Sequence, residues 1–244
     1  YMIVAILAGG KGTRLSELTK EVPKPMVKIG SKPILVHIMS LYLKYGYKDF
    51  FVLVGHKSHV IKKFFKNFKK PNKAFDYKIG KKKCKITLVE SGNNSMTGGR
   101  LKKIKNLLQD EEEFMFTYGD GVSDINIKKL VDFHQKNKKM ITVTAVRPPA
   151  RFGEILIKNN LVHSFKEKPQ VSEGWINGGF FIAHKKFLDL IQNEKTILEK
   201  KPLELAAKKK QLTVFKHHSF WKCMDTLRDR EVLQKIYKKN KFKY

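Results

Sequence analysis

The chain has few cysteines and no long apolar segment. Its 244 residues include only two cysteines, Cys84 and Cys223, which are far apart and have no second cysteine or histidine nearby at metal-binding spacing. This argues against both a disulfide framework and a zinc site. The longest apolar runs, MIVAIL and FFVLV, are far shorter than the roughly 20 residues of a membrane-spanning helix. With no leader-like cationic segment, we expect a cytoplasmic protein without a membrane partner.

Arginine is also scarce, although positive charge is abundant. The formal net charge is +29, and only six of the 51 basic residues are arginine. Such a charge favours binding to phosphate backbones. The lysines, however, fall in short clusters along the whole chain, whereas a nucleic-acid groove concentrates arginine and aromatic residues on one element. We therefore expect a solvated surface and no nucleic-acid partner, with a nucleic-acid-binding module as the alternative from another class.

Strand-like and helix-like segments alternate through the first 146 residues. Amphipathic segments at 32–46, 59–68 and 126–139 separate apolar, β-branched runs at 2–7, 50–55, 86–90, 114–120 and 140–146. This rhythm predicts an α/β fold with a doubly wound, mostly parallel, Rossmann-like sheet, which binds ligands at the carboxyl ends of its strands. Residues 153–184 read as strands joined by tight turns and predict a small antiparallel β insertion against the sheet. No linker divides the chain, so one domain over residues 1–244 is expected.

The first strand-like run is followed at once by GGKGTR, residues 9–14. Glycines let the main chain turn sharply and approach a polyphosphate closely. The spacing fits neither the dinucleotide fingerprint nor the P-loop. It does offer a nest of N–H donors with Arg14, whose guanidinium binds phosphate oxygens in pairs, although a purely structural turn is an equal alternative. Ten residues further on, Lys24 lies between two prolines that fix its backbone.

Seven motifs occur in the order found in sugar-1-phosphate nucleotidylyltransferases. The stretch MIVAILAGGKGTRLSELTKEVPKPM is followed by TGGRLKKI, FTYGDGVSD, RFGEI, SFKEKP, INGGFF and FWKCMDTLRD. From residue 2 to residue 237 the chain resembles the glucose-1-phosphate cytidylyltransferases of this family. It departs from the pattern at Lys222 and Cys223, where the family commonly has glutamine and proline.

The resemblance implies an enzyme that joins CTP and glucose 1-phosphate, by in-line attack on the α-phosphorus, to give CDP-glucose and pyrophosphate. Lys24 matches the catalytic lysine beside the α-phosphate, and Arg14 would hold the β and γ phosphates. Mg²⁺ would be bound by Asp120 and Asp225, because this ion prefers hard oxygen ligands. We also expect Asp225 to be the N-cap of the final helix, since DTLRD reads as a helix start.

The resemblance also implies where each substrate binds. Nucleotide contacts are expected from Leu7, Ala8, Gly9, Gly10, Lys11, Gly12, Thr13, Arg14, Thr97, Gly98, Gly99, Arg100 and Gly119. Contacts with the sugar phosphate are expected from Gly153, Glu167, Lys168, Asn177 and Gly178. Residues 2–146 would thus form the nucleotide-binding half and residues 147–240 the sugar-binding half. Family members commonly form homo-oligomers, and we expect one here.

Two alternatives lie within the family. The chain could use another nucleoside triphosphate or another phosphorylated acceptor, which a panel of substrates would distinguish. It could also be an inactive regulatory homologue, but the presence of Lys24, Asp120 and Asp225 disfavours this.

Overall fold

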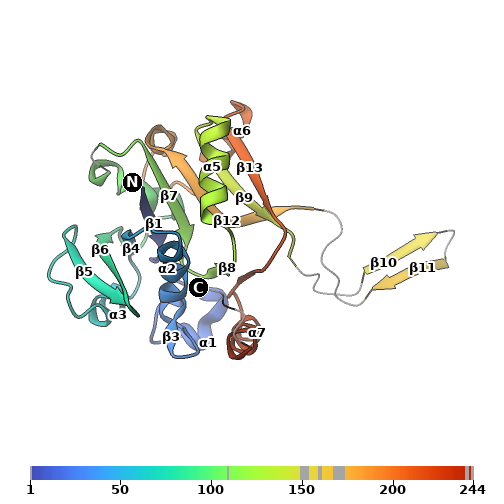
Figure 1. Cartoon of the computed structure of the whole chain (residues 1–244), viewed down its shortest axis with the longest axis horizontal. Helices are drawn as coiled ribbons and strands as arrows, with labels where there is room; N and C mark the ends of the chain where they lie inside the picture. Colours follow the sequence, from blue (N-terminus) through green and yellow to red (C-terminus); the bar gives the residue numbers. More distant parts are fainter. Residues whose placement is uncertain are drawn as a thin grey trace.

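The computed structural model describes residues 2–108, 110–148, 154–158, 161–166, 174–239 and 242. Its main sheet contains eight strands: β1 (Ile3–Leu7), β4 (Asp49–Val54), β5 (Ala74–Ile79), β6 (Lys82–Glu90), β7 (Glu113–Tyr118), β9 (Ile141–Val146), β12 (Ile176–His184) and β13 (Leu212–His217). Their order is β13-β9-β12-β7-β1-β4-β6-β5 (Figure 1). The pairs β7–β1, β1–β4, β4–β6 and β13–β9 are parallel, whereas β12 and β5 run antiparallel to their neighbours. The predicted mostly parallel sheet is confirmed.

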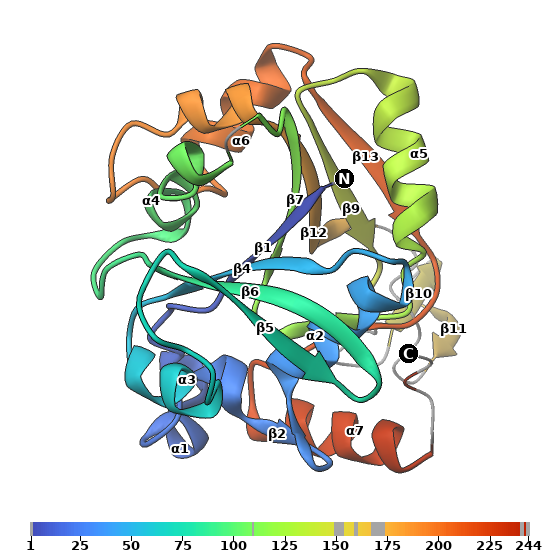
Figure 2. The same ribbon diagram turned by 60° about the vertical axis from the view of Figure 1, so that its left-hand side comes forward.

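Helices cover both faces of the sheet, as Figure 2 shows. One face packs against α2 (Ile34–Lys44), α3 (Ser58–Phe64), α5 (Ile127–Asn137) and α7 (Leu227–Lys238). The other packs against α4 (Thr97–Lys102), the 3₁₀ helix η4 (Lys185–Leu190) and α6 (Lys201–Lys208). In β1, Val4 and Ile6 enter the first core while Ala5 enters the second, so the strand is apolar at every position. No helix in these described ranges has the length and apolar character that a membrane crossing requires.

Shorter elements surround the sheet edge where parallel strands end. The chain after β1 forms η1 (Thr13–Leu15), α1 (Ser16–Thr19) and η2 (Lys24–Met26), followed by the hairpin β2 (Lys28–Ile29) and β3 (Lys32–Pro33). A second ribbon pairs β8 (Gly121–Ser123) with β14 (Trp221–Cys223), and η3 (Lys105–Leu107) follows α4. A separate antiparallel hairpin contains β10 (Glu154–Lys158) and β11 (Leu161–Lys166) (Figure 1).

Two strands differ from the sequence expectation. The predicted antiparallel insertion is confirmed for β10 and β11, but β12 enters the main sheet between β7 and β9 instead of packing against it. Buried residues from Gly178 to Ala183 explain this, because both faces of that stretch are covered. The sequence reading also lacked edge strand β5, whose alternating exposed residues include lysine, a residue that protects open sheet edges.

The last helix is fixed to the β2–β3 turn by a contact that requires glycine. Gly30 has φ +62°, and a Cβ atom there would lie 2.1 Å from ring carbon Cε1 of Tyr237. The Gly30 N–H also donates to Oε1 of Gln234 at 2.7 Å. Tyr237 further packs edge-on against His37 of α2, with ring centres 5.5 Å apart. These contacts hold α7 against the segment that follows Lys24.

We predict that Gly30→Ala destabilises the protein more than Gly80→Ala. Gly80 is a matched control because its φ is +60° but nothing lies within 4 Å of its Cβ position. A left-handed alanine costs about 1–2 kcal/mol in either variant, and the overlap with Tyr237 adds about 1–3 kcal/mol. Denaturant unfolding measures the difference, and equal losses of stability would contradict the Tyr237 contact.

Candidate active site

A cleft of about 600 Å³ lies at the edge of the sheet where β1 and β7 end and β12 begins. Parallel strands place the loops after their carboxyl ends on this edge, which is where the sequence predicted the ligand. The cleft is lined by Leu7, Gly10, Gly12, Lys24, Pro25, Thr97, Arg100, Thr117, Tyr118, Gly119, Asp120, Gly121, Ile176, Asn177, Gly178, Gly179, Glu199, Trp221, Cys223 and Asp225. Most of the predicted functional residues that the structure describes are therefore brought together.

The glycine-rich loop after β1 is held by the strand next to it. Ala8 donates its N–H to the carbonyl of Leu53, and His56 donates its N–H to the carbonyl of Gly9. In the part of the chain that the structure describes, no hydrogen bond uses the N–H groups of Gly10, Lys11 and Gly12. The loop can therefore present donors to an anion, as expected of a nest. The backbone of Arg14 belongs to η1, but its side chain lies outside the described part.

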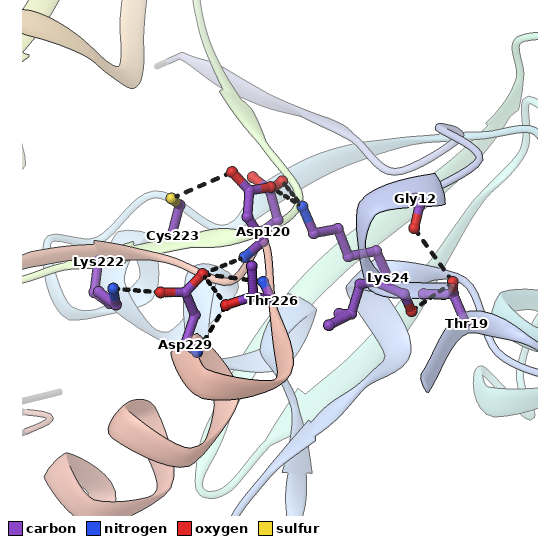
Figure 3. A network of polar contacts seen from close by, with 10 residues as sticks. Gly12, Thr19, Lys24, Asp120, Lys222, Cys223, Thr226 and Asp229 are labelled. Carbon is purple, nitrogen blue, oxygen red and sulfur yellow. Dashed lines mark hydrogen bonds and ion pairs between the residues drawn. The ribbon is translucent and has the colours of Figure 1, made fainter. Parts of the chain in front are cut away.

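Gly12 packs closely on the segment that leads to Lys24. It has φ +64°, and a Cβ atom there would be 3.3 Å from the methyl carbon of Thr19 and 3.4 Å from Cβ of Lys24. The Thr19 hydroxyl also donates to the Gly12 carbonyl at 3.3 Å (Figure 3). Glycine at this position thus combines a left-handed turn with a close approach of two loop segments.

Lys24 is buried and points at two carboxylates. Its Nζ lies 2.8 Å from Oδ2 of Asp120 (Figure 3) and 2.5 Å from Oδ1 of Asp225. Pro23 and Pro25 flank it in a 3₁₀ turn, and only 11% of its side chain is exposed. Burial alone lowers the pKa of Lys24, but the two carboxylates outweigh burial and raise its pKa above the ordinary value. The ammonium is therefore a fixed positive charge.

The two carboxylates come from the same end of a small ribbon, where β8 begins and the antiparallel β14 ends. Asp120 lies between β7 and β8, and Asp225 follows β14. Residues Gly121 and Cys223 pair across the ribbon, and Met224 donates its N–H to the Asp120 carbonyl at 2.9 Å. Residues 105 apart in sequence are thereby held so that both carboxylates reach the same ammonium group.

This donor set fits Mg²⁺. The ion is commonly bound by one or two carboxylates, with water and substrate phosphates completing its octahedron. Asp120 and Asp225 provide two converging carboxylates in an open cleft, and no larger cluster of His, Cys, Asp or Glu suited to a metal occurs among the described residues. A site that relies on phosphate for its remaining ligands would need no more protein donors than these two.

Asp225 is not the N-cap of α7, so that expectation is wrong. Thr226 is the N-cap, and it forms a capping box with Asp229. The Asp225 N–H instead donates to Oδ2 of Asp229 at 3.1 Å, while the capping box is formed by the side chains of Thr226 and Asp229. Asp229 also pairs with Lys222 at 2.5 Å (Figure 3). Burial opposes the charge of Asp229, but Lys222 and Thr226 outweigh it and lower its pKa.

Arg100 contacts three loops at the cleft, those that follow β1, β4 and β6. Its guanidinium donates to Oγ of Ser91 at 2.8 Å and to the carbonyl of Gly92 at 2.7 Å, and the residue is only 4% exposed. A Cβ atom at Gly9 would lie 2.2 Å from Nη1 of Arg100, and a Cβ atom at Gly55 would lie 2.1 Å from it. These glycines therefore make room for the guanidinium, which lines the cleft beside the glycine-rich loop.

The other predicted nucleotide contacts of this stretch, Thr97, Gly98 and Gly99, have a packing role. A Cβ atom at Gly98 would be 2.7 Å from the carbonyl oxygen of Thr196, and one at Gly99 would be 2.1 Å from that of Glu194. Both glycines thus bring α4 close to residues 194–198. Thr97 lines the cleft and accepts a hydrogen bond from the N–H of Leu198 at 3.0 Å. Nucleotide contact by Gly98 and Gly99 stays a prediction.

The predicted sugar-binding residues are described only in part. Asn177 and Gly178 line the cleft, where Nδ2 of Asn177 donates to the Tyr118 hydroxyl at 3.2 Å and Nε1 of Trp221 donates to the Gly178 carbonyl at 2.7 Å. The other three predicted residues, Gly153, Glu167 and Lys168, lie outside the described residues.

The lining residues absent from the sequence prediction include three with large polar or aromatic side chains: Tyr118, Glu199 and Trp221. Tyr118 directly precedes Gly119 and Asp120, so its position next to a predicted site was the available signal. Trp221 belongs to the motif that contains Asp225. Glu199 had no local signal, because only the tertiary structure brings its segment to the cleft.

Comparison with known proteins identifies the family of this chain. Residues 3–229 match the family model described as nucleotidyl transferase. The chain is 45% identical over 250 aligned residues to glucose-1-phosphate cytidylyltransferase of Salmonella typhimurium, covering 98% of this chain and 97% of that protein. It is 37% identical over 246 residues to the probable glucose-1-phosphate cytidylyltransferase of Bacillus subtilis, covering 97% and 96%.

Solved structures show the same fold. HddC from Yersinia pseudotuberculosis superposes with a TM-score of 0.71 at 23% identity, covering 97% of this chain and 100% of that one. The family match spans nearly the whole chain, and the relatives align over nearly their full length. The chain therefore belongs to the nucleotidyl transferase family.

Proposed function

We propose that this protein joins CTP and glucose 1-phosphate to form CDP-glucose and pyrophosphate. The observation that carries the reaction class is the convergence of Lys24, Asp120 and Asp225 beside the glycine-rich loop. The substrates follow from the names of the relatives, which align with the chain over nearly its whole length. A different nucleoside triphosphate or phosphorylated sugar is the alternative within the same reaction class.

In the proposed reaction, a phosphate oxygen of glucose 1-phosphate forms a bond to the α-phosphorus of CTP. The bond from that phosphorus to the bridging oxygen of the β-phosphate breaks, and its electron pair leaves with pyrophosphate. Such a transfer needs two anions brought together in line and their charge neutralised, with little covalent help from the protein. Lys24 provides a fixed charge for the α-phosphoryl group, and the N–H groups of Gly10, Lys11 and Gly12, with Arg14, hold the departing phosphates.

Asp120 and Asp225 would hold Mg²⁺. When bound, this ion neutralises phosphate charge and orients the phosphates for displacement. The two carboxylates are already positioned by the β8–β14 ribbon, so the protein loses little freedom when it binds the ion.

The remaining expectations concern organisation and surroundings. We propose that residues 2–146 bind the nucleotide, and that residues 147–240, with Gly153, Glu167, Lys168, Asn177 and Gly178, bind the sugar phosphate. A homo-oligomer, a cytoplasmic location and the absence of nucleic-acid and membrane partners stay predictions. Size-exclusion chromatography with light scattering tests the oligomer directly.

A pyrophosphate-release assay tests the proposed function. Glucose 1-phosphate is combined in turn with CTP, UTP, dTTP, ATP and GTP in the presence of Mg²⁺, and CTP is then combined with other sugar 1-phosphates. We expect the highest kcat/KM for CTP with glucose 1-phosphate. A higher value for another pair would replace the proposed substrates, and no release with any pair would overturn the reaction.

We predict that Lys24→Met lowers kcat by roughly two to three orders of magnitude, because a preorganised charge at the transferring phosphoryl group is lost. Lys28→Met is the matched control, since Lys28 is exposed and lies just beyond η2. Steady-state pyrophosphate release measures both variants. Undiminished turnover in Lys24→Met would contradict the electrostatic role, and an equal loss in Lys28→Met would show that the effect is not specific to the cleft.

Asp120→Asn and Asp225→Asn should each lower activity by roughly a hundredfold or more, because each removes a charged ligand of an ion that supplies several kcal/mol. Asp132→Asn, on the exposed side of α5, is the control. Activity is measured against Mg²⁺ concentration, and Mn²⁺ binding in the presence of CTP is measured by calorimetry. Unchanged metal affinity in both cleft variants would refute the metal assignment.

A further inference from the structure

A third carboxylate lines the cleft and does not pair with Lys24. Glu199 lies in the turn before α6 and lines the cleft together with Asp120 and Asp225. Its oxygens accept hydrogen bonds from two neutral hydroxyls, Oε1 from Tyr118 and Oε2 from Thr97, each at 2.6 Å. Among the described residues no cation forms an ion pair with it. Within the described part of the chain, Glu199 is thus a carboxylate without a counter-charge, in a cleft that we propose binds phosphate-bearing substrates.

Its position is fixed by elements from several parts of the chain. Thr97 bonds to Glu199 and also accepts from the N–H of Leu198. Gly99 donates its N–H to the carbonyl of Thr196, which fastens α4 to the same segment. The Tyr118 ring lies edge-on to Phe181 and fills the space beside Gly179, where a Cβ atom would be 2.6 Å away. Glu199 therefore does not need to be ordered by a ligand.

The chemistry of the cleft restricts what Glu199 can contact. A carboxylate repels phosphate oxygens, so it must lie away from the triphosphate. Each carboxylate oxygen has accepted one hydrogen bond and keeps capacity for another. The matching ligand group is a donor, either an amino group of a base or a hydroxyl of a sugar.

The neighbours of Glu199 favour the base. It bonds directly to Thr97, which belongs to the predicted nucleotide-binding stretch, and it reaches Asn177 of the predicted sugar-binding set only through Tyr118. It also belongs to the α4 and α6 side of the sheet, whereas Asp225 precedes α7 on the opposite side. Phosphates at Lys24 and a base near Thr97 would place the nucleotide across the sheet edge.

We propose that Glu199 accepts a hydrogen bond from the exocyclic amino group of cytosine and thereby selects CTP over UTP. Cytosine carries a donor at the position where uracil and thymine carry an acceptor oxygen, which a carboxylate repels. This inference rests on the proposed function, because it explains a preference for CTP.

The test compares binding of CTP and of UTP to the full-length protein by calorimetry with Mg²⁺ and without sugar phosphate. Wild-type protein is expected to bind CTP more tightly. In Glu199→Ala the ratio of the two affinities should fall by about tenfold or more. Glu199→Gln should lower the ratio further, because its amide can donate to the uracil oxygen while still accepting from Tyr118 or Thr97. Glu204→Gln, an exposed change on α6, should leave the ratio unchanged.

The outcomes separate this inference from the proposed function. If wild-type protein prefers CTP and both Glu199 variants keep that preference while remaining folded by thermal melting, the inference is overturned. An unchanged nucleotide ratio with a raised KM for glucose 1-phosphate would overturn it in favour of a sugar contact. Failure of the wild-type protein to release pyrophosphate would overturn the proposed function, and equal wild-type affinity for CTP and UTP would overturn base selection by Glu199.

Discussion

The contact of one buried ammonium with two carboxylates is the constraint on which the site depends. Lys24, Asp120 and Asp225 come from segments separated by 96 and 201 residues, yet they meet within hydrogen-bonding distance. Buried charges of one sign are costly, so the loss of any partner would leave the others uncompensated. The β8–β14 ribbon and the capping box of α7 fix the carboxylates, while the two prolines and the contact of α7 with the β2–β3 turn fix the lysine.

Glycines around the cleft serve packing as much as turning. The Arg100 guanidinium occupies the space that a Cβ atom at Gly9 or Gly55 would need. In the same way, the Tyr237 ring fills the Cβ position of Gly30, and the carbonyl of Glu194 fills that of Gly99. In each case the absence of a side chain lets two segments approach within a distance that a Cβ atom forbids. The loops around the cleft are thereby held by the body of the protein, so that few groups need ordering when a substrate binds.

The cleft is also divided by chemistry. Lys24 and the N–H groups of the glycine-rich loop suit phosphate, whereas Glu199, Tyr118 and Thr97 form a neutral or negative region suited to donor groups of a ligand. A single extended substrate with a charged end and a hydrogen-bonding end matches this division. The fold places both regions at one edge because β1 and β7 are parallel neighbours.

Local patterns in the sequence predicted most of the sheet strands, the helices α2, α3 and α5 and the loop after β1, because side-chain periodicity reports burial one residue at a time. The order of the motifs identified Lys24, Asp120 and Asp225 as candidate site residues. Only the tertiary structure decided that β12 joins the main sheet, that Thr226 instead of Asp225 caps α7, and that Arg100 supports three loops. The same holds for Glu199, which reaches the cleft through contacts with residues 81 and 102 positions away. Such pairings leave no periodic trace, because they depend on where distant segments pack rather than on the neighbours of each residue.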